Sequence, residues 1–199
     1  MRRQTSSIKD DFSILAQLMI PVCVAVNFVG GQLAAILKLP VYLDAIGTFF
    51  IAMLCGPWVA AATGMLSNIV AGIANPSNFP FIPVSIIIGI TAGFLAIRGM
   101  FTAWWKWVLS ILILSAVSIL AAAPVVVLLY GGITGGGTSI ITAVAMAAGA
   151  NIWTAFFGTE GIFTVLDRII SFIICWLVIR VIPERTLIKF ICGRYYIKE

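Results

Sequence analysis

The chain has 199 residues, of which 62% are hydrophobic and only 10% are charged. Because a soluble domain carries about 25% charged residues, this composition excludes an ordinary soluble protein and predicts an integral membrane protein. The formal net charge of +5 does not indicate nucleic-acid binding, since the basic residues lie at the ends of hydrophobic runs and form no stripe.

Hydrophobic runs recur along nearly the whole chain, so we expect one membrane domain over residues 1–199. A helix that crosses about 30 Å of hydrocarbon needs around 20 apolar residues, and shorter ones are tolerated where protein shields them. By this rule six spans are predicted, at residues 14–37, 43–55, 58–74, 83–98, 104–130 and 161–182. The first run is longer than the roughly 7–15 apolar residues of a signal peptide, so we interpret it as a retained span.

Residues 140–157 form the ambiguous segment of the topology. They are rich in alanine and contain Gly149 and Asn151, so we interpret them as an additional helical segment on one side of the membrane. With both termini cytoplasmic, most basic residues face inward, as the positive-inside rule requires: Arg2, Arg3, Lys9, Arg98, Lys106, Arg180, Arg185, Lys189, Arg194 and Lys198. The prediction is therefore an all-α bundle of six transmembrane helices, a multi-pass protein of the cell membrane.

Several kinds of chemistry lack their residues in this sequence. The chain has no histidine, which excludes HExxH zinc proteolysis and Ser-His dyads, and it has no phosphate-binding GxxxxGKS/T motif. The four cysteines, at positions 23, 55, 175 and 192, form no CxxC pair and are expected to be small buried side chains. We therefore expect no enzyme, no metal site and no cofactor in this chain.

The remaining polar residues collect toward the predicted outer half of the bundle. An ionisable residue in a span costs about 2.5 to 3.5 kcal/mol on insertion scales, so each one is a functional candidate. Asp44 has two local alternatives, because it could cap the second helix or pair with Lys38. Asp167 could form an ion pair with Arg168, and Glu160 shares a helical face with Asp167. That face would suit a cationic or hydrogen-bond-donating ligand if it points into the bundle, and would be solvated if it lies at the interface.

Aromatic and small residues also have two interpretations each. Tyr42 and Trp153 could stack on a ligand ring or anchor the chain at the membrane interface. Asn75 and Asn78 lie beside prolines and could bind ligand or form turns. A set of small residues in the third and fourth spans predicts close helix packing: Ala60, Gly64, Ser67, Gly89 and Gly93.

Three segments of the chain form a familiar arrangement: "NFVGGQLAAILKLPVYLDAIGTFFIAMLCGPWVAAATGMLSNIVAGI", the proline-rich "NPSNFPFIP" and the last span "LDRIISFIICWLVIRVIP". They resemble the substrate-binding S-components of energy-coupling factor vitamin transporters. The resemblance extends over about residues 14–183. It implies a six-helix protein that captures a vitamin at the outer face and reorients on a transmembrane coupling subunit, which two ATPase subunits drive with ATP.

The resemblance also implies where the site lies. Residues 38–44, 75–83 and 131–160 would cover the ligand pocket, and the residues expected to bind substrate are Tyr42, Asp44, Asn75, Asn78, Asn151, Trp153 and Glu160. Members of the family often carry an AxxxA patch for docking, but here Ala16 is followed by Ile20. Docking on the coupling subunit would then involve Pro21 and Ala25, or Ala60 and Gly64.

The substrate class is the widest choice that the sequence leaves open. The likeness within the family favours hydroxymethylpyrimidine or pyridoxine, with riboflavin, cobalamin, folate and pantothenate as alternatives. Two other classes compete with a transport subunit, namely an intramembrane enzyme and a structural membrane scaffold. The missing histidine argues against the enzyme, and polar residues collected on one side argue against the scaffold.

Overall fold

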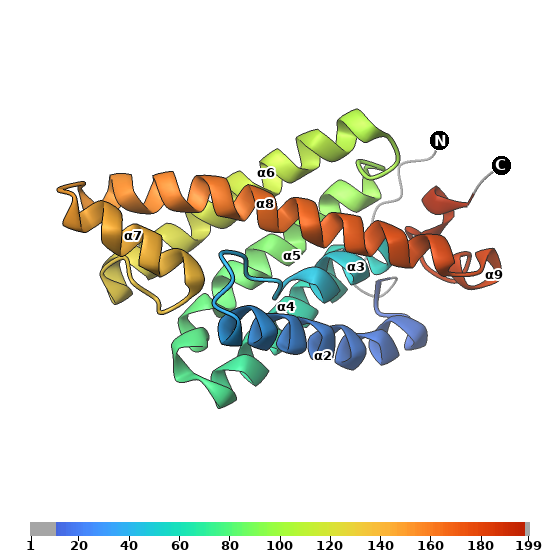
Figure 1. The fold of residues 1–199 in the computed structure, drawn as a ribbon. Helices are drawn as coiled ribbons and strands as arrows, with labels where there is room; N and C mark the ends of the chain where they lie inside the picture. Colours follow the sequence, from blue (N-terminus) through green and yellow to red (C-terminus); the bar gives the residue numbers. More distant parts are fainter. Residues whose placement is uncertain (1–10, 198–199) are drawn as a thin grey trace.

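Long apolar helices make up most of the chain (Figure 1), and the computed structural model describes residues 11–197. Within these residues there are helices and no strands, which confirms the all-α prediction. The elements are α2 (Ile14–Ile36), α3 (Ile46–Cys55), α4 (Pro57–Ala74), η1 (Pro76–Phe81), α5 (Ile82–Ile97), α6 (Trp104–Pro124), η2 (Val125–Leu129), α7 (Gly137–Ala147), α8 (Ile152–Val181), α9 (Glu184–Leu187) and η3 (Gly193–Tyr196).

Five helical stretches in the described part of the chain are long and apolar enough to cross a bilayer. They are Ile14–Ile36, Pro57–Ala74, Pro76–Ile97, Trp104–Leu129 and Ile152–Val181. Their outward faces are apolar, as Ile14, 80% exposed, and Val181, 83% exposed, illustrate. Such faces suit lipid and not water, so the chain is a multi-pass membrane protein.

α3 is much shorter than the other central helices. Its ten residues rise about 15 Å, roughly half of the hydrocarbon thickness. It packs against α2, α4, α5 and α8, and Phe49, Ile51 and Met53 are fully buried. The predicted span at 43–55 therefore exists as a shorter helix inside the bundle, and the loop at residues 37–45 continues its path.

The last helix differs from its prediction. A span was predicted at 161–182, and a separate helical segment at 140–157, but α8 already begins at Ile152. The chain turns at Gly149, whose φ of 95° ends α7, and Asn151 caps α8 by accepting a hydrogen bond from the Trp153 amide at 3.0 Å. The sequence prediction placed the start at Gly161, yet glycine in a helix interior costs only about 1 kcal/mol and α8 continues through it.

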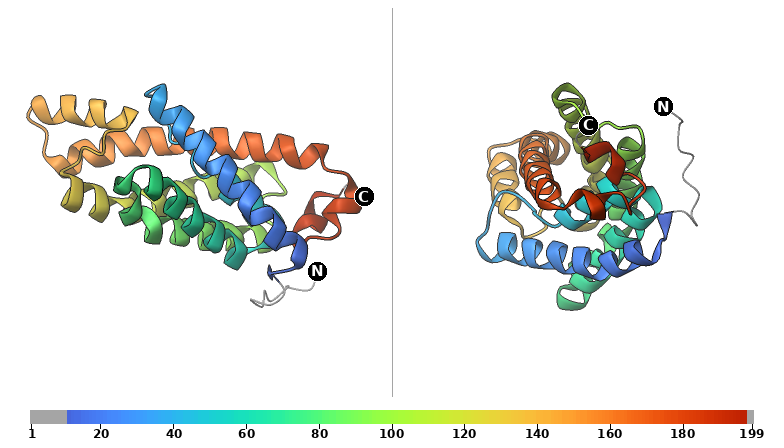
Figure 2. Two further views of the ribbon diagram at one scale, coloured as in Figure 1. Left: turned by 90° about the horizontal axis from the view of Figure 1, so that it is seen from below. Right: turned by 90° about the vertical axis from the view of Figure 1, so that its right-hand side faces the viewer.

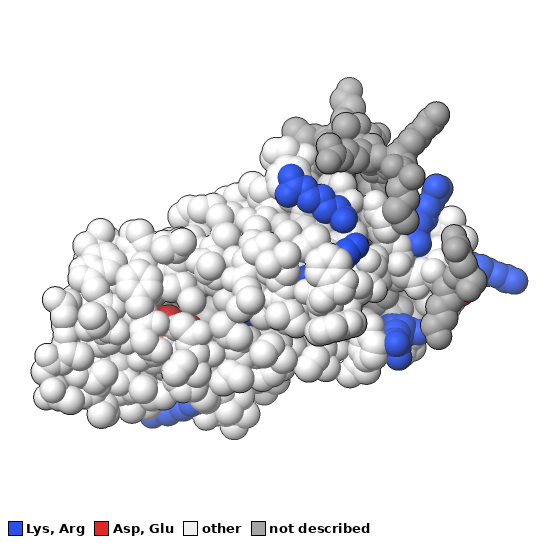
Figure 3. All heavy atoms as spheres, turned by 90° about the horizontal axis from the view of Figure 1, so that it is seen from above, with Lys and Arg blue, Asp and Glu red and all other residues white. Residues whose placement is uncertain are grey.

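Both ends of the described chain lie at the same end of the bundle. α2 begins and α8 finishes there, while η1, α7 and the loop at residues 37–45 lie at the opposite end (Figures 1 and 2). Lys and Arg side chains also gather toward the first end (Figure 3). The predicted inward-facing Arg2, Arg3, Lys9 and Lys198 lie outside the described residues.

Small residues let α4 and α5 approach closely, as predicted. A Cβ on Gly89 would lie 2.6 Å from the Ala60 carbonyl oxygen, and one on Gly64 would lie 2.8 Å from the Ser85 carbonyl oxygen. Ala60 and Gly64 are therefore buried inside the bundle, although they were considered for docking a partner. Pro21 and Ala25, the other docking candidates, are exposed on α2.

The four cysteines are free and buried, as expected. Their neighbours in the core include Phe172, which stacks on Phe49 at 4.9 Å and on Phe101 at 5.0 Å between ring centroids. This aromatic stack joins α8 to α3 and to the turn before α6. The larger apolar cluster thus lies in the half of the bundle nearer the chain ends, and a smaller one, of Ala123, Val126, Val127 and Phe156, lies where α6 and η2 pack on α8.

Adding one methyl group at Gly93 is expected to destabilise the protein by about 1 to 3 kcal/mol. A Cβ there would lie 2.2 Å from the Cα of Pro57, so the Gly93→Ala variant must push α5 away from α4. The matched control is Gly158→Ala in α8, where an added Cβ meets nothing within 4 Å and alanine should stabilise the helix by about 0.5 to 1 kcal/mol. Thermal unfolding in detergent measures both, and equal melting temperatures for the two variants would contradict this packing.

Candidate substrate-binding cavity

A cavity of about 380 Å³ lies among the helices, at the end of the bundle that holds η1 and the loop at residues 37–45. Its size falls within the range of about 300 to 1,000 Å³ that is typical of small-molecule sites. Polar groups are distributed over its wall, including Asn27, Gln32, Ser67, Asn68, Ser85 and Ser118. Three charged residues also line it, namely Asp44, Glu160 and Arg168.

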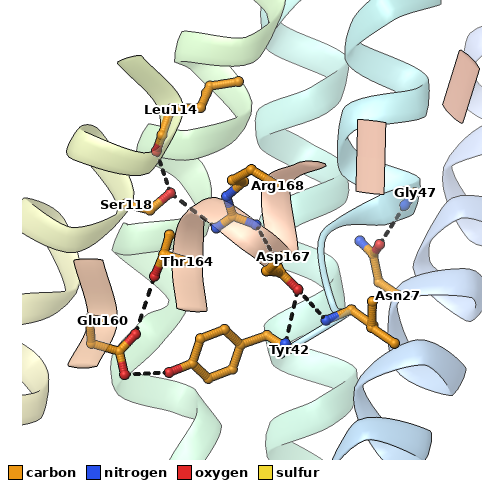
Figure 4. A network of polar contacts seen from close by, with 10 residues as sticks. Asn27, Tyr42, Gly47, Leu114, Ser118, Glu160, Thr164, Asp167 and Arg168 are labelled. Carbon is orange, nitrogen blue, oxygen red and sulfur yellow. Dashed lines mark hydrogen bonds and ion pairs between the residues drawn. The ribbon is translucent and has the colours of Figure 1, made fainter. Parts of the chain in front are cut away.

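The Asp167 carboxylate holds the loop that closes one side of the cavity. Its Oδ1 accepts hydrogen bonds from the backbone amides of Tyr42 at 2.9 Å and Leu43 at 2.8 Å (Figure 4). Leu43 has a φ of 53°, a left-handed conformation that a leucine rarely adopts without such support. Asp167 itself is 0% exposed, so these charge-assisted bonds form away from water.

Tyr42 fixes the same loop at a second point. Its hydroxyl donates to Glu160 Oε1 at 2.6 Å and lies 2.9 Å from Thr138 Oγ1 of α7. Thr164, one turn further along α8, donates to the other oxygen of Glu160 at 3.2 Å. Figure 4 shows the contact of Tyr42 with Glu160 of α8, and together with the contact to Thr138 one tyrosine connects the loop to both α7 and α8.

Arg168 lies on the inner wall and joins α8 to α6. Its Nη1 pairs with Asp167 at 2.8 Å, its Nη2 donates to Ser118 Oγ at 3.0 Å, and its guanidinium lies 5.0 Å from the ring centre of Phe49. It is 4% exposed, and its Nε has no hydrogen-bond partner among the described residues. The ion pair that the sequence suggested for these neighbours is thus present and buried between helices.

Asn27 joins three helices at the opposite wall. Its Nδ2 donates to Thr48 Oγ1 at 2.8 Å and Ser67 Oγ at 2.9 Å, and its Oδ1 accepts from the Gly47 amide at 2.6 Å. These bonds satisfy the side chain of Asn27, which is 2% exposed. Asn27 therefore shapes the wall of the cavity through α2, α3 and α4.

Asp44 differs from the other acids because its carboxylate is open to the cavity. The cap position of α3 is taken by Ala45, without a side-chain hydrogen bond, and among the described residues the ion pair formed is that of Asp167 with Arg168, not one of Asp44 with Lys38. Neither local role that the sequence suggested for Asp44 is observed. Its side chain is exposed, and the surface that it exposes borders the cavity.

The surroundings of Asp44 change its acidity. Although its side chain is open to the cavity, desolvation by the protein atoms around Asp44 is the largest cause and raises its pKa to about 6 from 3.8; the nearby Asp167 also raises it, and Arg168 opposes the change. At neutral pH the folded protein thus keeps a carboxylate charged in a place that disfavours the charge. A carboxylate of this kind, in a cavity, is a candidate for ligand recognition.

The structure brings together five of the seven residues predicted to bind substrate. Tyr42, Asp44, Asn75, Asn78 and Glu160 all line the cavity. The two asparagines also form turns as the alternative suggested: Asn75 accepts from the amide of Ser77 at 3.2 Å, and Asn78 donates to the Asn75 carbonyl at 3.1 Å.

The other two predicted residues, Asn151 and Trp153, lie outside the cavity lining. Asn151 caps α8, and Trp153 is 40% exposed and stacks on Phe157 with the ring centres 6.2 Å apart. They were placed near the site because residues 131–160 were treated as one covering segment. The early start of α8 separates them from it.

The sequence interpretation missed most of the aromatic wall. Phe28, Phe81, Tyr130 and Phe156 line the cavity, and Phe81 and Tyr130 stack with ring centroids 6.0 Å apart. Tyr130 also donates its hydroxyl to the Ser77 carbonyl at 2.8 Å, which connects η1 to the end of η2. These residues gave no signal in the sequence because an aromatic in an apolar run is usually a core or lipid-facing residue.

Replacing Asp167 by asparagine is expected to destabilise the protein by about 3 kcal/mol, because it leaves the buried Arg168 without its counter-charge. The double variant Asp167→Asn/Arg168→Gln should recover part of this loss, since no unpaired charge remains. Glu184→Gln, at an exposed carboxylate of α9, serves as the control and should change little. Thermal unfolding measures all three, and a single variant as stable as the parent would contradict the role of Asp167.

Replacing Asp44 by asparagine is expected to stabilise the protein without ligand by about 1 kcal/mol above pH 7, a value reduced for solvent in the cavity. The folded-state pKa of Asp44, about 6, lies above 3.8, so the folded protein binds this proton more tightly than the unfolded chain does. The parent therefore gains stability as pH falls from about 6 toward 4, and the advantage of Asp44→Asn should shrink over the same range. Melting temperatures against pH test this, with Glu184→Gln as control; a constant difference between the curves would rule it out.

No model of a protein family, no curated protein and no solved structure matches this chain. The site combines a cavity of small-molecule size with a loop held beside it by two acids of α8 and a third acid open to the cavity.

Proposed function

We propose that this chain is the substrate-capture subunit of an energy-coupling factor transporter in the cell membrane, where it binds a small water-soluble vitamin or vitamin precursor. One observation carries the proposal: a cavity of about 380 Å³, lined by aromatic rings, amides and an open carboxylate, lies beneath a loop that side chains of α8 hold closed. A structural scaffold would have no use for such a space, because polar groups buried in a membrane protein cost free energy.

The position of the cavity supports capture from outside the cell. It lies at the end of the bundle opposite the basic residues of α8 and α9, and the positive-inside rule assigns that basic end to the cytoplasm. The two sides of the membrane then have different tasks. The outer end takes up the substrate, and the inner end and the membrane-facing helices meet the rest of the transporter.

The size and lining of the cavity narrow the substrate. A volume of about 380 Å³ is suited to a one-ring or two-ring heterocycle and is too small for the corrin ring of cobalamin. Ring stacking and amide hydrogen bonds fit hydroxymethylpyrimidine or pyridoxine, both small heterocycles with hydroxymethyl groups. Riboflavin, folate and pantothenate are the alternatives from the same class.

Transport in this proposal needs partners. A transmembrane coupling subunit and two ATPase subunits would supply the movement, with ATP consumed by the ATPases and no cofactor bound by this chain. Pro21 and Ala25 on the exposed face of α2 are the available docking residues, because Ala60 and Gly64 are covered by α5. The substrate itself would bind before any ATP is used.

Purified protein in detergent is expected to be stabilised by at least one compound in a panel of water-soluble vitamins and precursors, with no ATP present. A ligand at 100 times its Kd adds about 2.7 kcal/mol, which thermal unfolding detects readily. The Ala122→Phe variant fills part of the cavity and should abolish the effect. Its control is Leu120→Phe on the same helix, at a residue 65% exposed on the outer surface, which should keep it. If no compound shifts the melting temperature, the transport proposal fails.

A further inference from the structure

The acids and bases around the cavity do not balance. Asp44, Glu160 and Arg168 line it, and Asp167 lies directly behind Arg168. Arg168 is neutralised by Asp167 at 2.8 Å, which leaves two carboxylates without a basic partner. No other Lys or Arg of residues 11–197 lines the cavity, so its wall carries an excess of negative charge.

The two remaining carboxylates have different surroundings. Glu160 is 9% exposed and already accepts hydrogen bonds from the hydroxyls of Tyr42 and Thr164. The Asp44 carboxylate receives no hydrogen bond from any other side chain among the described residues, and it is open to the cavity. Asp44 is therefore the acid whose charge the protein leaves for something else to satisfy.

The aromatic wall favours the same kind of ligand. Rings of Phe28, Phe81, Tyr130 and Phe156 line the cavity. The face of an aromatic ring is electronegative, so a site lined by several rings favours a cation over an anion, and the attraction grows when the cation is removed from water. This observation is independent of the carboxylate count and indicates the same sign of charge.

We propose that the ligand of this cavity is a small organic cation, an aromatic heterocycle with a protonated amine or ring nitrogen, and that Asp44 is its counter-ion. The inference rests on the proposed function in requiring that the cavity binds a small heterocycle, and it adds the charge of that heterocycle. Anionic vitamins such as folate and pantothenate are then excluded, since their carboxylates would face Asp44 and Glu160 without a free basic group.

Two matched series of compounds separate charge from shape. Pyridoxamine, pyridoxine and 4-pyridoxic acid share one ring and differ at one substituent, which is an ammonium, a hydroxyl or a carboxylate. The second series places an aminomethyl, hydroxymethyl or carboxyl group at position 5 of 4-amino-2-methylpyrimidine. Dissociation constants from calorimetry should rank the amine first in at least one series, about tenfold tighter than the alcohol, with the carboxylate weakest.

Variants of Asp44 assign the preference to this residue. Asp44→Asn should weaken amine binding about tenfold or more and leave the alcohol within about twofold. Asp44→Glu keeps the charge and should keep the order of the compounds. Glu184→Gln removes a carboxylate far from the cavity and should change neither affinity nor order. Unfolding curves of each variant confirm that it is folded.

The possible results separate the inference about the charge of the ligand from the proposed function. A preference for the alcohol or the carboxylate in every series that binds, or an amine preference that survives Asp44→Asn, overturns the inference and leaves the vitamin-capture proposal standing. Binding of none of these compounds, together with none of the vitamin panel, overturns the proposed function and the inference with it. An amine preference that is lost in Asp44→Asn and kept in Asp44→Glu supports both.

Discussion

The Asp167 carboxylate connects the parts of this protein that would otherwise separate. One of its oxygens accepts hydrogen bonds from the amides of Tyr42 and Leu43, and the other pairs with the guanidinium of Arg168. Arg168 in turn donates a hydrogen bond to Ser118 of α6. A loop with a left-handed leucine, the central helix that follows it and two long helices thus meet at one buried group. Without the loop in this position the cavity would lose one of its walls, so part of its volume and of its polar lining depends on this contact.

Three acids near one cavity perform three tasks because their partners differ. Asp167 is satisfied by backbone amides and an arginine, and Glu160 by hydroxyl groups of the loop and of its own helix. Asp44 lies on the same loop as Tyr42, lines the cavity, and accepts no hydrogen bond from another side chain among the described residues. A carboxylate that the protein partly desolvates and leaves without a partner is a cost to the folded state, and such a cost is commonly retained where a ligand offsets it.

The short α3 helix explains where the cavity can exist. Its ten residues occupy only the half of the bundle nearer the chain ends, where Phe49, Phe101 and Phe172 form a dry aromatic core. In the other half of the bundle, the space that a longer helix would have filled is lined by the loop at residues 37–45 and by polar side chains from α2, α4 and α8. Glycines on both helices let α4 and α5 pack closely beside this cavity.

The sequence by itself determined that the chain is built of long helices. A span must be apolar over a known length, and in lipid a helix satisfies its own backbone hydrogen bonds. The sequence also placed Asp44, Tyr42 and Glu160 among the candidates, since an ionisable or polar group in such a chain is costly. Only the tertiary structure decided which of them face the same space: Asn151 and Trp153 are as polar or aromatic as the others, yet an early start of α8 turns them away. The aromatic wall and the open state of Asp44 depend on contacts between helices distant in the chain, and no local pattern of residues records those contacts.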